Sequence, residues 1–84
     1  MGTVTFTVES LEGDKKIRVY DRIKDESPFD RDVRAGAKET VNVFGIAGEG
    51  EVDIFYTCPQ QSEKPFKEKH RPHNGDNVQV PGCR

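Results

Sequence analysis

The sequence has few of the residues that build helices or long apolar segments. It contains no tryptophan, one methionine and a single leucine, Leu11, against nine valines and four isoleucines. β-Branched side chains lose rotamer freedom in helices and pack well on pleated sheets. No apolar run approaches the length of a membrane span, and a net charge of −2 gives no field that would select nucleic acid or an anionic membrane. We therefore predict an all-β protein without a membrane span or a nucleic acid partner.

Alternation of apolar and polar residues predicts the strands. The chain of 84 residues is expected to form one domain, residues 1–84, with a thin core. Period-two patterns mark residues 3–9, 16–23, 40–43, 51–58 and 77–80 as strands. Their inward faces should carry Val4, Phe6 and Val8 in the first strand and Ile17, Val19 and Ile23 in the second. We expect these first two strands to form a hairpin.

Two segments interrupt this alternation. Residues 27–36 fit a short helix or an edge strand from Phe29 to Val33, and the edge strand is favoured because an isolated helical turn needs a packing partner. Gly45 lies where the alternation changes phase, which predicts a β-bulge. Five to six short strands separated by turns predict a small antiparallel β-sandwich of the immunoglobulin-like kind. A small open β-barrel is the alternative.

The two cysteines predict the compartment. Cys58 and Cys83 allow one intramolecular disulfide. Residues 59–76 between them are polar and contain three prolines, which predicts a long loop closed at its base by this bridge. Small exported domains commonly carry such bridges. We therefore expect an extracytoplasmic protein, secreted or periplasmic, from which a leader has already been removed.

Two surfaces are candidates for binding. One is the basic part of the predicted loop, whose chemistry suits a phosphate, a sulfated glycan or an acidic protein surface. Its residues are Lys64, Phe66, Lys67, Lys69, His70, Arg71 and His73. The other surface is a sheet face with Tyr20 and Phe55, which alternation places outside the core. Exposed aromatic residues on a sheet are typical of a protein or carbohydrate contact, unless a second apolar layer covers them.

Charged residues on the predicted outer faces are complementary. Glu49, Glu51 and Asp53 recur with period two, so they share the outer face of one strand. The outer face of the second strand carries Lys16, Arg18 and Arg22. If the two strands are neighbours, opposite charges pair across them. Such pairs contribute solubility and strand register.

No catalytic or metal motif is evident. Cys58, His70, His73 and Cys83 are zinc-ligand types, but their spacing lacks the close ligand pairs of structural zinc sites. None of the three serines lies in a nucleophile elbow, and no carboxylate pair can be singled out as general acid and base. We therefore expect no enzyme activity, no cofactor and no metal.

One stretch resembles a known kind of domain. Val33 to Gly36 and Thr40 to Val43, followed by Glu51 to Cys58, resemble small secreted bacterial β-sandwich domains, among them the amylase inhibitors of the tendamistat type. In those domains a turn leads into an alternating strand, and a later strand ends in cysteine. This chain has one possible disulfide where that family has two, and it lacks the inhibitory Trp-Arg-Tyr triplet. No functional residue is carried over.

Taken together, the patterns predict an exported binding or interaction module. We expect it to be a monomer that contacts a protein or a carbohydrate. One alternative is a secreted inhibitor or effector that inserts the loop with Pro65, Phe66 and Pro72 into an enzyme. A second alternative is a metal-binding domain that uses the loop histidines.

Overall fold

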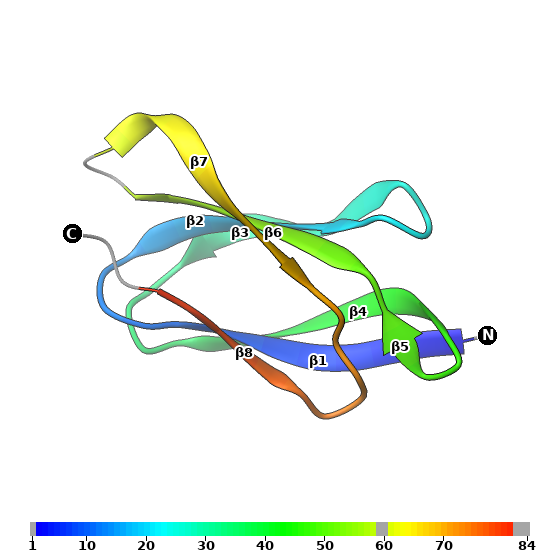
Figure 1. The fold of residues 1–84 in the computed structure, drawn as a ribbon. Coiled ribbons are helices and arrows are strands. Elements are labelled where there is room, and N and C mark those ends of the chain that lie inside the picture. Colours follow the sequence, from blue (N-terminus) through cyan, green and yellow to red (C-terminus); the bar gives the residue numbers. More distant parts are fainter. Residues whose placement is uncertain (1, 59–60, 82–84) are drawn as a thin grey trace.

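The protein forms two four-stranded β-sheets that face each other. The computed structural model describes residues 2–58 and 61–81, with side chains from Lys64 onward in the second segment. The strands are β1 (Gly2–Ser10), β2 (Lys15–Asp21), β3 (Glu26–Val33), β4 (Lys38–Ile46), β5 (Glu49–Gly50), β6 (Val52–Cys58), β7 (Gln61–His70) and β8 (Asn77–Val80). One sheet has the order β5-β4-β1-β8 and the other β3-β2-β6-β7 (Figure 1). The all-β prediction is confirmed, but the described residues form eight strands where five to six were predicted.

Alternation along the strands builds the core between the sheets. Val4, Phe6 and Val8 of β1 are buried, as are Ile17 and Val19 of β2. The remaining apolar core residues are Phe29, Val33, Val41, Val43, Val52, Ile54, Tyr56, Val78 and Val80. The inward residues predicted for these strands are confirmed, except that Ile23 lies in the turn after β2 and is half-buried. No helix that could cross a membrane occurs in the part of the chain that the structure describes.

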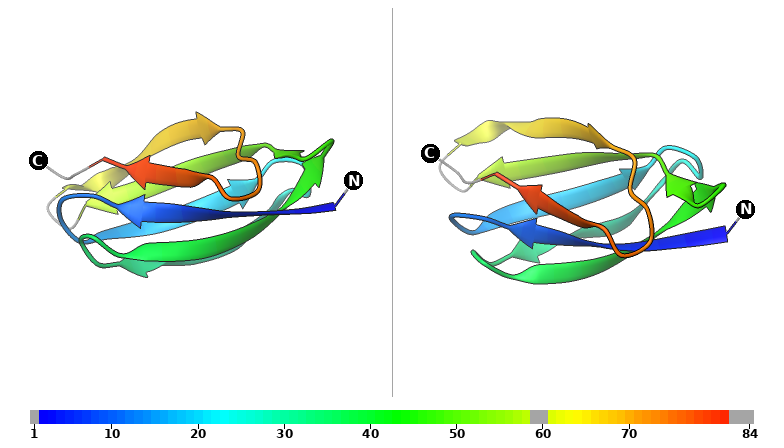
Figure 2. Two further views of the ribbon diagram at one scale, coloured as in Figure 1. Left: turned by 90° about the horizontal axis from the view of Figure 1, so that it is seen from below. Right: turned by 60° about the horizontal axis from the view of Figure 1, so that its bottom comes forward.

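The predicted hairpin of the first two strands is wrong. β1 pairs with β4 in antiparallel fashion and with β8 in parallel, whereas β2 lies in the other sheet between β3 and β6. The turn between β1 and β2 therefore carries the chain from one layer to the other, as Figure 2 shows. Alternation specifies which side chains point inward, and it does not specify which strand lies alongside.

The two interrupted segments have different outcomes. The edge-strand interpretation of residues 27–36 is confirmed, because β3 lies at the edge of its sheet and is followed by a turn at Ala35-Gly36. The predicted β-bulge at Gly45 is wrong, because the β1–β4 register runs without a shift from Gly2↔Gly45 to Glu9↔Lys38. Gly45 occupies a buried position in phase with Val43.

The predicted loop at residues 59–76 is largely a strand. β7 pairs with β6 in antiparallel fashion, with Phe66 opposite Tyr56. As an edge strand it is rich in lysine and contains Pro65, residues that natural proteins place on edges to block further pairing. The loop prediction is therefore wrong for residues 61–70, because polar residues and proline are typical of loops as well as of edge strands. The connection from β7 to β8 then spans residues 71–76, and Pro72 within it is buried.

Candidate binding face

The outer face of the β3-β2-β6-β7 sheet carries one row of side chains that crosses all four strands. The register places Asp30 beside Arg18, Arg18 beside Phe55, and Phe55 beside Lys67. Side chains directly opposite one another lie on the same face of a sheet. Asp30 and Lys67 are exposed, and Arg18 and Phe55 are half-buried. An acid, a cation, an aromatic ring and a second cation therefore lie side by side.

Two cations flank the aromatic ring of this row. The guanidinium carbon of Arg18 lies 4.4 Å from the centre of the Phe55 ring, and the Nζ atom of Lys67 lies 6.0 Å from it. Cation–π contacts of this kind contribute about 0.5–1 kcal/mol at exposed sites. Among the residues whose side chains the structure describes, Arg18 makes one long hydrogen bond, from its Nη1 atom to Ser27 Oγ at 3.4 Å, and no ion pair. Most of its N–H groups therefore remain available to a partner.

A shallow hollow of about 360 Å³ opens beside the row. It is lined by Lys16, Arg18, Asp30, Phe55, Thr57 and Pro65. Lys16 and Asp30 are 4.0 Å apart and both are largely exposed, so solvent screens their attraction. With two cations and one acid around an aromatic side chain, the hollow is amphipathic and carries a small positive excess.

The neighbouring row contains Tyr20, which was predicted to join the contact surface. Its hydroxyl donates a hydrogen bond to the carboxylate of Asp25, and this bond raises the pKa of Tyr20. Asp53 lies opposite Tyr20 and is 6% exposed, with Arg22 Nε at 3.4 Å and Lys67 Nζ at 3.9 Å. The hydroxyl of Tyr20 is thus occupied by an intramolecular partner.

The predicted charge pairing across neighbouring strands is confirmed for Arg22, which contacts Glu51 and Asp53. The other two cations have different partners: Lys16 contacts Asp30, and Arg18 contacts the Phe55 ring.

The basic residues predicted as one loop surface lie on two faces of β7. Lys67 and Lys69 share the outer face with Phe55, because they pair with Phe55 and Asp53. Phe66 and His70 pair with Tyr56 and Val52 and therefore belong to the inward face. Phe66 nevertheless remains 47% exposed and stacks on Tyr56 with ring centres 5.2 Å apart. Lys64, Arg71 and His73 are exposed, Arg71 and His73 beyond the end of the strand.

The two histidines lie beside carboxylates. The Nε2 atom of His70 is 3.1 Å from Glu68 Oε1, and that of His73 is 3.3 Å from Glu49 Oε2. Among the described residues, no group of three or more potential metal ligands comes together. Cys58 is buried and is not a free thiol, and Cys83 lies outside the described residues. The bridge between these cysteines therefore stays a prediction.

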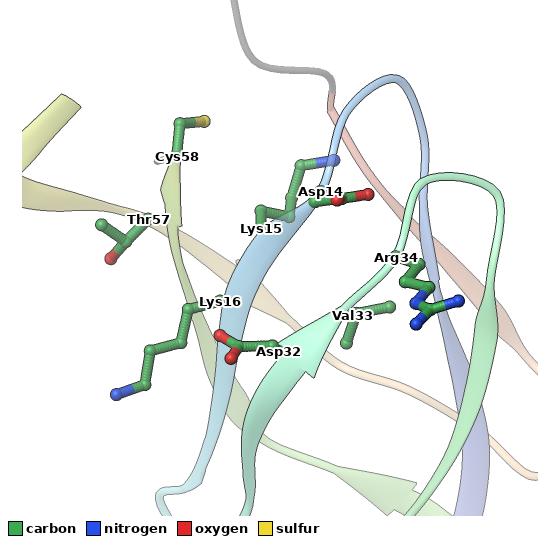
Figure 3. A pocket seen from close by; sticks show the side chains of 8 residues that line it. All are labelled: Asp14, Lys15, Lys16, Asp32, Val33, Arg34, Thr57 and Cys58. Atoms are coloured by element: carbon green, nitrogen blue, oxygen red, sulfur yellow. The ribbon is translucent and has the colours of Figure 1, made fainter. Parts of the chain in front are cut away.

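A second pocket, of about 530 Å³, opens near Cys58 at the end of β6 (Figure 3). Its wall contains Lys15, which is 2% exposed and donates hydrogen bonds to Ser10 Oγ at 2.9 Å and to the Glu12 carbonyl at 3.3 Å. Burial lowers the pKa of Lys15, and the carboxylates of Asp14 and Glu12 oppose this effect. In Figure 3 the side chains of Lys15 and Lys16 point in opposite directions. The amino group of Lys15 is thus hydrogen-bonded to the end of β1 and to the segment between β1 and β2, and it stabilises this turn.

Lys15 is not among the residues predicted to face inward, although its place in the alternation indicates that position. Lys15 is in phase with the inward residues Ile17 and Val19 of the same strand. Lysine is almost never fully buried without partners, so a lysine at an inward position is expected to face solvent instead.

Comparison with known proteins adds no further information. No family model matches this chain, and no curated protein and no solved structure matches it. The geometry of the outer face therefore carries the functional argument.

Proposed function

We propose that this protein is an exported β-sandwich binding module without catalytic activity, and that its contact surface is the outer face of β2, β6 and β7. The observation that supports this proposal is the row Arg18–Phe55–Lys67 beside the hollow of about 360 Å³. Arginine and aromatic residues are enriched at protein interfaces and among the residues that dominate binding energy. Because the row is carried by three paired strands, its side chains are presented on a rigid support.

Selection of ligands from a displayed peptide library against the immobilised protein tests this proposal. We expect the selected peptides to lose roughly tenfold or more in affinity, about 1.4 kcal/mol, for the variant Phe55→Ala. The matched control is Thr40→Ala, an exposed position on β4 in the other sheet, which should bind like the wild type. Peptides that bind Phe55→Ala as tightly as the wild type would argue against this contact surface.

Export is proposed from the predicted disulfide between Cys58 and Cys83. We expect the intact mass of the purified protein to rise by two hydrogen atoms on reduction, and the melting temperature to fall, because a bridge restricts the unfolded chain. Alkylation of the unfolded protein in denaturant without reductant provides the control, since a bridged protein then takes up no label whereas reduced cysteines, Cys58 included, are accessible. Labelling of both cysteines under these conditions would overturn the bridge and with it the argument for export.

The two alternative functions have less support. The inhibitor hypothesis depended on inserting residues 59–76 as a loop, but most of this segment is β7, and Pro72 is buried. The metal hypothesis depended on His70 and His73, which contact separate carboxylates, Glu68 and Glu49. The choice between an immunoglobulin-like sandwich and an open barrel also stays a prediction. The binding module accounts best for the row Arg18–Phe55–Lys67 on the outer face of the sheet.

A further inference from the structure

We propose that the partner of this face is a protein segment rich in aspartate and glutamate, and that two of its carboxylates bind Arg18 and Lys67 on either side of Phe55. This inference rests on the proposed function and adds the chemistry of the partner. Three features of the face support it: the available donors of Arg18, the covered ring of Phe55, and the acids that interrupt the cations.

Arg18 is positioned to bind a carboxylate. A guanidinium carries five N–H donors in a planar fork that matches the two oxygens of a carboxylate. Its contact with the Phe55 ring, at 4.4 Å, holds the group against the sheet, and within the described residues its one hydrogen bond, to Ser27, is long. A partner carboxylate would therefore gain paired hydrogen bonds from a side chain that is already partly immobilised.

The covered ring disfavours a neutral carbohydrate as the partner. Stacking of a sugar on an aromatic side chain requires a bare ring face. Arg18 lies over the Phe55 ring, 4.4 Å from its centre, and Lys67 lies 6.0 Å from the centre of the same ring. A negatively charged ligand binds the two cations, so it does not require an uncovered ring face.

The acids on the same face disfavour a uniform polyanion. Asp30 lies beside Arg18 in the row, and Asp53 lies 3.9 Å from Lys67. Duplex DNA carries about one charge per 1.7 Å of its length, so its phosphates would also meet these acids. Arg18 and Lys67 stand two strand spacings apart, roughly 10 Å, and alternate residues of an extended segment are about 7 Å apart. Separated carboxylates on a flexible peptide fit this spacing because both cationic side chains are long.

Titration of the isotope-labelled protein with two synthetic peptides, followed by NMR, tests the inference. The probe is acetyl-Glu-Glu-Tyr-Glu-Glu-amide, and its control replaces each Glu with Gln. We expect saturable shifts at the amides of Arg18, Phe55 and Lys67, with affinity for the Gln peptide at least about tenfold lower. Raising the ionic strength from about 0.02 M to about 0.15 M should weaken binding of the Glu peptide, since salt screens exposed charges.

Substitutions define which cations are used. Arg18→Gln and Lys67→Gln should each weaken binding of the Glu peptide roughly three- to tenfold. Arg18→Lys should recover only part of the loss, because lysine lacks the planar fork. The matched control is Lys38→Gln, an exposed position on β4, which should change the affinity less than about twofold.

Other outcomes separate this inference from the proposed function. Equal binding of both peptides, or shifts confined to other residues, would overturn the acidic partner. Binding of a heparin oligosaccharide at Phe55 without binding of the Glu peptide would also overturn it, but would leave the binding module standing. A third outcome would overturn both the acidic partner and the proposed contact surface. In that outcome the Glu peptide does not bind, and the library peptides bind Phe55→Ala as tightly as the wild type.

Discussion

The substitution Asp21→Ala is expected to lower the free energy of unfolding by about 4 kcal/mol. Asp21 is the last residue of β2 and is 1% exposed. Its Oδ1 atom accepts hydrogen bonds from the backbone N–H of Ile23 at 3.0 Å and of Lys24 at 3.2 Å. Its Oδ2 atom accepts one from Phe44 N–H at 2.8 Å, on β4 of the opposite sheet. One carboxylate thus closes the turn after β2 and joins the two sheets.

The size of the expected loss follows from these three bonds. A hydrogen bond to a charged group contributes about 1.5–3 kcal/mol, and a buried donor left without an acceptor costs about 1–3 kcal/mol. The three bonds share one carboxylate, so their losses are not additive and the total is below their sum. Equilibrium unfolding in urea, followed by circular dichroism, measures the change. An unchanged dependence of the unfolding free energy on urea concentration would show that the wild type and Asp21→Ala unfold to similar states.

Two variants serve as controls for Asp21. Asp21→Asn keeps an oxygen for the turn but turns an amide NH2 group toward Phe44 N–H, so about half of the loss is expected. Asp32→Ala removes an exposed carboxylate of β3 and should change stability by less than about 0.5 kcal/mol. A loss below about 1 kcal/mol for Asp21→Ala would contradict the role assigned to this side chain.

The substitution Gly45→Ala is expected to destabilise the protein by about 2 kcal/mol. A Cβ atom at this position would overlap Cγ2 of the buried Val4 on the neighbouring strand and would lie 3.4 Å from the carbonyl oxygen of Glu49. Adding atoms to a packed core costs about 1–3 kcal/mol, and the stiff side chain of valine has little room to turn away. Thermal or urea unfolding gives the loss directly.

A double-mutant cycle separates the overlap from other effects. In Gly45→Ala combined with Val4→Ala, the new methyl group enters space that Val4 has vacated, so a coupling of about 1 kcal/mol or more is expected. Gly2→Ala is the matched control, because Gly2 pairs with Gly45 across β1 and β4 and nothing lies within 4 Å of its added Cβ atom. Strict additivity of the two core substitutions would show that Val4 is not the obstacle.

The sequence by itself determined the local structure of most strands. The period of two in β1, β2 and β6 placed Val4, Phe6, Ile17, Val19 and Ile54 inward, and all of them are buried. The same pattern placed Tyr20 and Phe55 on the outer face, where they lie half-buried. These predictions succeed because the alternation of side chains is a property of a single extended segment.

Only the tertiary structure decided which strands are neighbours and therefore which residues share a surface. β1 pairs with β4 and β8, β2 pairs with β3 and β6, and β7 takes the place of the predicted loop. As a result Lys67 joins Arg18 and Phe55, while Phe66 lies on the opposite face of the same strand. Strand pairing depends on contacts between residues distant in sequence and on the packing of two layers. A one-dimensional pattern contains neither, so the candidate binding face appears only when the sheet is assembled.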